Sequence, residues 1–185
     1  IHFKDVASWN SIIGASVEQG QVDMAFSLFE EMQRKMCSFP DIFTFTSLLK
    51  ACTSSQALNN AMLLHACICE DGLEHTVDIG TSLVNMYNKC NDLKDAQRVF
   101  DRMPKRNRIL WNSIISANVH HGKLELAHQL FDRMVNKERI IPDKITIVII
   151  LGACVRSKDL SKGKELHKFL LDHSYTIDEM IGSSL

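Results

Sequence analysis

Residues 8–32, SWNSIIGASVEQGQVDMAFSLFEEM, decide the fold of this chain, because the short patterns within them return further along the sequence. The pentapeptide WNSII occupies residues 9–13 and again residues 111–115, 102 positions later. A shift of 102 positions aligns residues 5–83 with residues 107–185 and gives 27 identities in 79 positions without a gap. An internal duplication explains a recurrence of this extent.

A shorter repeat lies inside each copy. One apolar set in residues 8–32 has the spacing i, i+3, i+4, i+7, which places its members on a single helical face: Ala25, Leu28, Phe29 and Met32. The same spacing returns four times: Ala61, Leu64, His65, Ile68; Ala96, Val99, Phe100, Met103; Ala127, Leu130, Phe131, Met134; and Gly163, Leu166, His167, Leu170. A second stripe precedes each set, as in Trp9, Ile12, Ile13 and Ser16. Each repeat is therefore predicted to be a pair of helices.

Glycine and proline mark the ends of the predicted helices. Gly20 and Gly122 follow the first stripe of each copy, where helices commonly end on a residue with positive φ. Pro40 and Pro142 follow the second stripe, and each precedes an aspartate that suits the N-cap of the next helix. We predict an all-α chain, an α-solenoid whose helix-turn-helix repeats stack into a right-handed superhelix around a continuous core.

Composition and charge limit the classes of function. The 21 Lys and Arg residues against 22 Asp and Glu residues give a net charge of −1, so no global field attracts phosphate or a membrane. No apolar run reaches the roughly 18 residues of a membrane-spanning helix. The six cysteines lack paired C-x-x-C spacing, which favours buried free thiols in a reducing compartment. The opening residues IHFK show neither a signal peptide nor a transit pattern.

The repeats resemble those of pentatricopeptide repeat proteins, in particular the plant organellar class built from successive P, L and S motifs. Residues 8–32 resemble a P motif, DIFTFTSLLKACTSSQALNNAMLLHACICEDG resembles an L motif, and IGTSLVNMYNKCNDLKDAQRVFDRMPKRN resembles an S motif. The resemblance implies one array over residues 1–185, with P at 6–41, L at 42–76, S at 77–107, P at 108–143, L at 144–178 and the start of S at 179–185.

This resemblance implies binding of single-stranded RNA, one base per repeat, read by the fifth and the last residue of each motif. The implied pairs are Asn10 with Asp41, Thr46 with Thr76, Thr81 with Asn107, Asn112 with Asp143, and Val148 with Asp178, followed by Ser183 alone. In the family, asparagine with aspartate favours U over C, and threonine with asparagine favours A. L motifs follow the code poorly, and Val148 cannot hydrogen-bond to a base. The expected target is 5′-U-x-A-U-x-R-3′, with the purine read by Ser183.

The second residue of each motif is expected to sandwich the bases through apolar contact. These residues are Ala7, Phe43, Ile109, Ile145 and Met180. Asp78 departs from the pattern, because an anion stacks badly on a base and repels phosphate. Periodicity alone also allows Asn10 and Asn112 to be capping or solvated residues near a helix start. The basic run Lys105, Arg106 and Arg108 fits phosphate contact and equally an exposed loop between repeats.

The sequence contains no catalytic motif that we recognise. It has no P-loop, no G-x-G-x-x-G, no nucleophile elbow, and no H-x-E with the paired cysteines of a cytidine-deaminase-like zinc site. We expect a non-catalytic recognition module that needs no cofactor or metal. The resemblance places the parent protein in mitochondria or chloroplasts, most often as a site-recognition factor for C-to-U RNA editing. It also implies contact with multiple organellar RNA editing factor proteins through the L motifs.

Three further expectations follow from the pattern. The near-neutral charge and the small number of code-following repeats also fit a protein–protein interaction scaffold on the same solenoid. Uncapped apolar ends at residues 6–13 and 180–185 favour a homodimer through those ends. His65 and His167 replace the phenylalanine of other repeats, so they are expected to be partly buried structural rings rather than metal ligands.

Overall fold

The structure, a computed structural model, describes residues 5–35, 39–52 and 57–172. Across those ranges the regular elements are helices, with no strand, which confirms the all-α prediction. The helices are α1 (Val6–Glu18), α2 (Val22–Arg34), α3 (Ile42–Ala51), α4 (Leu58–Glu70), α5 (Val77–Lys89), α6 (Leu93–Arg102), α7 (Arg108–His120), α8 (Leu124–Asp132), α9 (Lys144–Ser157) and α10 (Leu160–Asp172), with a π-helical turn, Arg133–Lys137, after α8.

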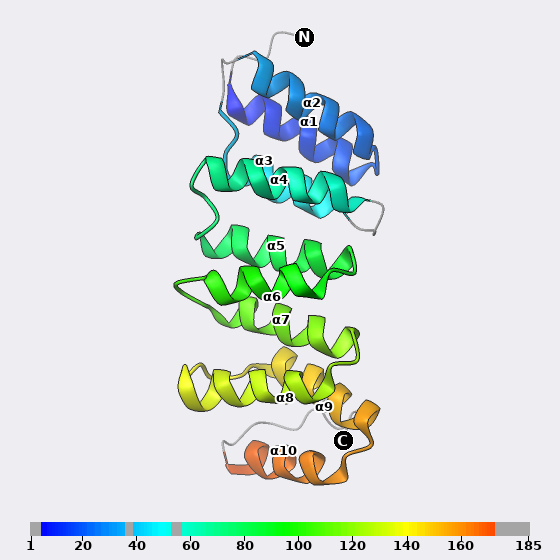
Figure 1. Ribbon diagram of the computed structural model, residues 1–185, viewed down its shortest axis with the longest axis vertical. Coiled ribbons are helices and arrows are strands. Elements are labelled where there is room, and N and C mark those ends of the chain that lie inside the picture. Colours follow the sequence, from blue (N-terminus) through cyan, green and yellow to red (C-terminus); the bar gives the residue numbers. More distant parts are fainter. Residues whose placement is uncertain (1–4, 36–38, 53–56, 173–185) are drawn as a thin grey trace. The chain divides into compact units, whose positions relative to one another are not determined.

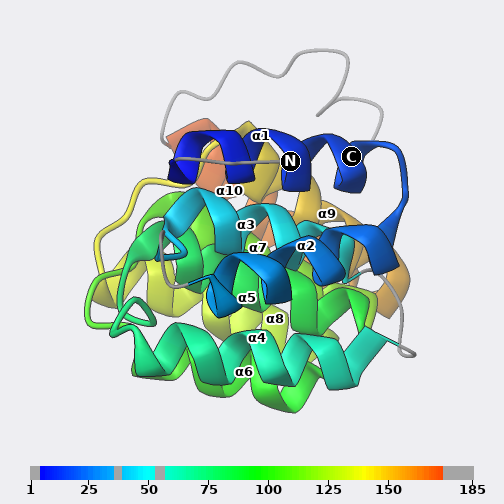
Figure 2. The same ribbon diagram turned by 90° about the horizontal axis from the view of Figure 1, so that it is seen from above.

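The chain forms two compact units, Ile1–Lys105 and Arg106–Leu185. In the first unit α1 packs against α2 and α3, α3 packs against α4 and α5, and α5 packs against α6 (Figure 1). In the second unit α7 packs against α8 and α9, and α9 packs against α10. Seen from above, α1 and α6 lie on opposite sides of the first unit (Figure 2). Each unit is therefore a stack of helical hairpins in which the first helices contact one another. The single array and the handedness of its superhelix stay predictions.

The predicted stripes form the core of each unit. Trp9 and Trp111 are 1% and 0% exposed, and most members of the recurring apolar sets are buried with them. The rings of Phe29 and Phe45 meet edge to face with centroids 5.8 Å apart, which joins α2 to α3. Burying an aliphatic or aromatic side chain of this size stabilises a fold by about 1.5–3 kcal/mol. The stacking of one hairpin on the next therefore accounts for much of the stability.

The helix ends follow the glycines and aspartates that the sequence predicts. Gly20 and Gly122 both have φ of 72°, and each follows the C-cap residue of α1 or α7. The residue after each glycine donates its backbone N–H to a carbonyl five residues back at 2.8 Å, as in a Schellman motif. Asp41 and Asp143 are the N-caps of α3 and α9. These four turn predictions are confirmed.

Thiols and histidines follow the expectations only in part. Cys52, Cys90 and Cys154 are buried, and burial raises the pKa of the Cys52 thiol to about 11. Burial was a wrong prediction for Cys69, which is exposed on α4 because it follows the core residue Ile68 and so turns away from the core. Among the described residues no group of three or more His, Cys, Asp or Glu side chains is gathered as a metal site. None of the described helices combines the length and hydropathy that crossing a bilayer requires.

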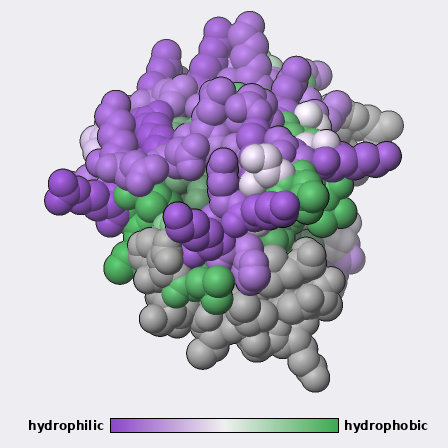
Figure 3. Space-filling model, turned by 90° about the horizontal axis from the view of Figure 1, so that it is seen from below, coloured by the Kyte–Doolittle hydropathy of each residue, from purple (hydrophilic) through white to green (hydrophobic). Residues whose placement is uncertain are grey.

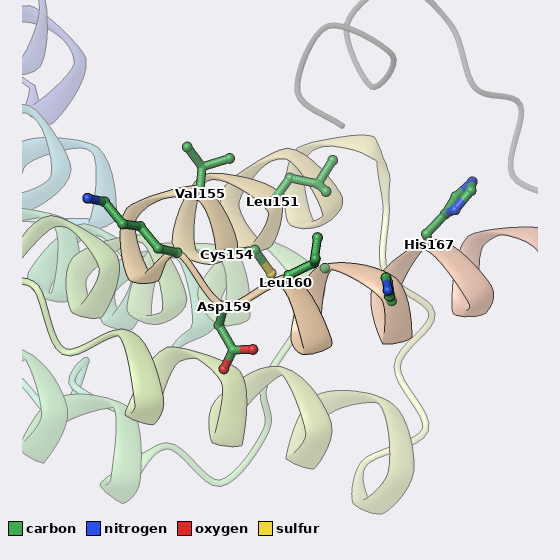
Figure 4. A pocket seen from close by; sticks show the side chains of 9 residues that line it. Leu151, Cys154, Val155, Asp159, Leu160 and His167 are labelled. Atoms are coloured by element: carbon green, nitrogen blue, oxygen red, sulfur yellow. The ribbon is translucent and has the colours of Figure 1, made fainter.

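The two histidines differ because their neighbours differ. His65 is half-buried, and its Nδ1 lies 2.8 Å from the Tyr87 hydroxyl on α5. His167 is exposed and lines an open pocket of about 560 Å³ on α9 and α10 with Leu151, Cys154 and Leu160 (Figure 4). The residues after α10 lie outside the described ranges, so no described helix packs against His167 as α5 packs against His65.

From the α10 side, the described surface is mostly hydrophilic with small hydrophobic patches (Figure 3).

We expect Gly122→Ala to destabilise the second unit by about 1–2 kcal/mol, because an L-residue with a side chain is strained at positive φ. Gly152→Ala is the matched control in the same unit. Gly152 lies inside α9 and a Cβ there meets no atom within 4 Å, so this change should stabilise by roughly 0.5–1 kcal/mol. Urea unfolding of both variants measures the difference, and equal effects would contradict the assigned turn.

Candidate nucleic-acid interface

Two equivalent polar clusters occur, one in each unit. In the first unit Asn10 on α1 donates from Nδ2 to Asp41 Oδ1 at 3.0 Å, and the Thr44 hydroxyl donates to Asn10 Oδ1 at 2.5 Å. In the second unit Asn112 on α7 donates to Asp143 at 3.2 Å, and Thr146 donates to Asn112 at 2.7 Å. We call each of these an Asn-Asp-Thr cluster. Each one joins the first helices of two successive repeats.

The aspartate and threonine of each cluster are set by the start of a helix. Asp143 Oδ1 accepts the Thr146 backbone N–H at 2.9 Å, and the Asp143 backbone N–H donates to Thr146 Oγ1 at 3.1 Å. Asp41 and Thr44 make the same reciprocal pair at the start of α3. This capping box satisfies backbone donors that the first helical turn leaves free. The contacts of α1 with α3 and of α7 with α9 then bring each asparagine to its aspartate.

Burial and charge define what each cluster offers. Both threonines are 0% exposed and Asn112 is 9% exposed. Burial raises the pKa of Asp143, but the hydrogen bonds from Thr146 and Asn112 and the nearby Arg108 outweigh burial and leave that pKa below its usual value. Asp41 also has a lowered pKa, because the bonds from Thr44 and Asn10 outweigh its burial. Both carboxylates are thus ionised at neutral pH and accept hydrogen bonds only.

The other implied base-reading pairs are not joined in this way. The Thr46 and Thr76 hydroxyls donate to the carbonyls of Phe43 and Leu73 at 3.3 and 2.9 Å, within their own segments. The Thr81 hydroxyl donates to the Val77 carbonyl at 2.7 Å, and the Asn107 side chain accepts the Leu110 backbone N–H at 2.9 Å. Val148 is half-buried. Asp178 and Ser183 lie outside the described residues. The cluster therefore forms where the next motif supplies a threonine at its third position.

The second residues of the motifs point to solvent. Phe43, Ile109 and Ile145 are 71%, 64% and 58% exposed, and Ala7 and Asp78 are exposed too. Met180 lies outside the described residues. Each second residue is three positions before the fifth residue of the same helix, so the two lie on neighbouring parts of one helical face. Side chains exposed in this way are accessible to a stacking partner from solvent.

The structure shows the partners of residues for which the sequence left alternatives open. Neither asparagine caps its own helix, because Asp5 and Asn107 accept the N–H groups at the starts of α1 and α7. Arg106 lies 3.6 Å from Glu138, with only 12% of its side chain exposed, and Arg108 lies 3.8 Å from Asp143. These two arginines of the basic run therefore have carboxylate partners in the second unit.

The sequence reasoning missed Thr44 and Thr146. Both occupy buried positions that were not assigned a role, although they hold the asparagine amides directly. One signal was present, because this threonine is among the identities between the two copies of the duplication. The threonine and the asparagine are 34 residues apart in the sequence, so their contact can be predicted only when the packing of the repeats is known.

Sequence comparisons give a consistent result. A model of the PPR repeat family matches residues 4–54 and 106–156, and a PPR repeat model matches residues 81–108. A chloroplastic pentatricopeptide repeat-containing protein of Arabidopsis thaliana is 37% identical over 182 residues, which is 98% of this chain and 29% of the relative. A mitochondrial one from the same plant is 36% identical over 174 residues, 94% of this chain and 19% of the relative. The chain thus spans less than a third of these relatives.

Solved structures show the same fold. The pentatricopeptide repeat protein PPR10, crystallised in complex with an 18-nucleotide psaJ RNA element, matches with a TM-score of 0.76 and 19% identity over 98% of this chain and 28% of that chain. The PPR domain of Arabidopsis thaliana protein-only RNase P 1, in complex with tRNA, matches with a TM-score of 0.74 and 15% identity over 96% and 95% of the two chains.

Asp143→Ala should destabilise the second unit by about 1–2 kcal/mol at pH 7, because α9 loses its N-cap. A carboxyl with a lowered folded-state pKa stabilises the fold above its unfolded pKa of about 3.9, and this stabilisation is lost as the pH falls through the folded-state pKa. The gap between the wild type and the variant should therefore narrow below about pH 4. Urea unfolding at pH 7 and pH 3 tests this. Glu165→Gln, an exposed change on α10, is the control and should alter stability by less than about 0.5 kcal/mol.

Proposed function

Because the chain belongs to the pentatricopeptide repeat family, we propose that it binds single-stranded RNA through the Asn-Asp-Thr clusters and the exposed second residues beside them. The observation that carries the proposal is the pairing of Asn10 with Asp41 and of Asn112 with Asp143, in the same geometry in both units. The PPR10 complex with RNA supports it, since that protein shares the fold. We expect each repeat to read one base, because each repeat supplies one such cluster or one pair of base-reading residues.

The resemblance to the family assigns a pyrimidine, uracil in particular, to each asparagine and aspartate pair, and the chemistry of the clusters is compatible with this. A carboxamide has both a donor and an acceptor, so it matches a base edge that carries both groups. The proposed target remains 5′-U-x-A-U-x-R-3′, in which the two clusters read the first and fourth bases. Thr81 and Asn107 would read the A, although the exposed Asp78 in the same motif opposes stacking there.

The proposed setting is an organellar RNA-processing factor of the P, L and S class, most often one that selects sites for C-to-U editing. The chloroplastic and mitochondrial names of the relatives support an organellar location for the parent protein. In this setting the chain is the non-catalytic recognition segment. It holds the nucleotides upstream of a cytidine and so positions a deaminase over that base.

A protein–protein scaffold is the second candidate, favoured by one observation. Met62 and Leu63 on α4 of the first L motif are 51% and 67% exposed, and Lys164 and Glu165 occupy the equivalent places on α10. Such an apolar pair also suits contact with an editing-factor protein through that L motif. The homodimer has less support at residues 6–13, because Trp9 and Ile13 are buried there, and residues 180–185 lie outside the described ranges.

The base code is tested by exchanging one pair. Wild-type chain should bind U-N-A-U-N-R RNA and lose at least about tenfold in affinity when the fourth base is changed from U to A, since one good base contact is worth roughly 1–3 kcal/mol. The double variant Asn112→Thr with Asp143→Asn should prefer A at that base. Fluorescence anisotropy with labelled RNA, at low and moderate salt, measures both. Equal binding of all RNAs by the wild type, lost with added salt, would leave phosphate contact alone.

The proposed stacking by the second residues of the motifs is tested separately, with phenylalanines of the first unit. Phe43→Ala should weaken RNA binding roughly 5- to 100-fold without changing the preferred bases, because aromatic stacking contributes about 1–3 kcal/mol per base. Phe39→Ala is the matched control, because Phe39 is also exposed, at 79%, but is not the second residue of a motif. The same anisotropy titration measures both variants, and equal losses of affinity in both would contradict stacking of a base on Phe43.

A further inference from the structure

We propose that Thr44 and Thr146 fix the orientation of the asparagine amide in the preceding repeat and so set the preference for uracil over cytosine. The inference rests on the proposed function and extends it to residues outside the fifth, last and second positions. Each threonine is the third residue of an L motif and acts on the asparagine of the P motif before it. They are positioning residues, because both threonines are 0% exposed and a bound base could therefore not reach their hydroxyls.

Counting donors and acceptors in the second cluster identifies where the hydroxyl proton goes. Asp143 Oδ1 already accepts the Thr146 N–H at 2.9 Å and Asn112 Nδ2 at 3.2 Å. Thr146 Oγ1 already accepts the Asp143 N–H at 3.1 Å, and its single proton faces Asn112 Oδ1 at 2.7 Å and Asp143 Oδ1 at 2.9 Å. Donation to Asn112 gives each of these donor groups one acceptor within the cluster and leaves the second Nδ2 hydrogen of Asn112 over. The first cluster repeats this geometry, with 2.5 Å from Thr44 to Asn10.

Two contact points hold the amide where one would not. The torsion that turns an asparagine carboxamide is broad, so one bond from Nδ2 to the aspartate leaves the amide plane free to rock. The threonine bond to Oδ1 adds a second point and fixes the plane. In a reversed amide, the oxygen would face the carboxylate, and two acceptors would then oppose each other.

A fixed amide can distinguish uracil from cytosine. Uracil presents an N3–H donor beside the O4 acceptor, whereas cytosine presents an N3 acceptor beside the N4 donor. In the cluster, the second Nδ2 hydrogen and the second Oδ1 lone pair of Asn112 are left for a base. For a base whose position is set by stacking, one orientation of these two groups complements N3 and O4 of uracil, and the reversed orientation complements N3 and N4 of cytosine. Holding the orientation therefore converts a residue that could read either pyrimidine into one that reads uracil.

The other repeats provide an internal comparison. The third residues of the motifs that follow the first L motif and the first S motif are Ile79 and Leu110. Both are buried, and neither carries a hydroxyl. Thr46 and Thr81 accordingly bond to carbonyls of their own helices. The orienting threonine thus occurs only at the two described junctions whose fifth residue is an asparagine, the side chain whose two ends need to be told apart.

The competing explanation is that the threonine serves only to start α9. The capping box needs a hydroxyl at this position too, so loss of stability alone does not separate the two roles. The ratio of uracil to cytosine affinity at one base does separate them, because a general loss of fold weakens both RNAs equally. Thr146→Val removes the hydroxyl while keeping the branched shape, and Thr146→Ser keeps the hydroxyl.

The experiment measures anisotropy of RNAs that carry U or C at the first or the fourth base, with the full 185-residue chain and its variants. Thr146→Val should lower the U-to-C affinity ratio at the fourth base by roughly 3- to 10-fold, the value of one hydrogen bond. The ratio at the first base should not change. Thr44→Val should show the reverse pattern, and Thr146→Ser should keep the wild-type ratio. Gly122→Ala serves as the destabilised control, with both ratios unchanged.

The outcomes are distinguishable. A position-specific fall of the ratio, restored by serine, supports the inference. A wild type that prefers U, together with valine variants that prefer it equally, overturns the role of the threonines but leaves RNA recognition intact. A fall of both ratios in every destabilised variant, Gly122→Ala included, also overturns it. A wild type that binds all four RNAs equally overturns the inference, and the change of the fourth base from U to A then decides separately whether the proposed function stands.

Discussion

A hairpin of two short helices cannot bury its apolar face alone, and the rest of this structure depends on that constraint. Each repeat has 31 to 36 residues and carries two apolar stripes, one on each helix. Folding one hairpin leaves part of the first helix uncovered, so the next first helix must pack there. The contacts of α1 with α3, α3 with α5, and α7 with α9 are the result. Stability is therefore shared between neighbours, and an internal hairpin is not an independent unit.

The same contact builds the polar clusters. Because first helices lie against first helices, the fifth residue of one repeat meets the aspartate that ends the same repeat and caps the first helix of the next one. That aspartate has a local duty as N-cap of α3 or α9, which fixes it before any ligand arrives. The asparagine amide is then held by groups whose positions the helix start already determines. A site made in this way is preorganised, so RNA binding would pay little to order these side chains.

Much of the fold followed from the sequence because its signals are periodic and local. The stripes predicted the helix pairs, the positive-φ glycines predicted the ends of α1 and α7, and the Pro-Asp steps predicted two N-caps. The clusters were less accessible. The pairing of Asn112 with Asp143 could be predicted only from the resemblance to a family. The role of Thr146 was overlooked because its partner, Asn112, lies 34 residues away in the sequence. The exposure of Cys69 was missed although the apolar stripe of α4 contains Ile68 and leaves Cys69 off the core face. The exposure of His167 was missed because the apolar spacing places it in a core stripe and does not show which side chains cover α10.

A net charge of −1 constrains how such a surface can bind RNA. Proteins that bind through phosphate contacts gain affinity from counterion release, and their affinity falls steeply with salt. Arg106 and Arg108 have carboxylate partners in Glu138 and Asp143, so their charges are partly neutralised within the protein. In the proposed complex, base contacts through apolar side chains such as Phe43 and Ile109 and through oriented amides would therefore supply much of the affinity. A surface with this balance would bind weakly wherever the bases are wrong, so its low net charge would favour selectivity.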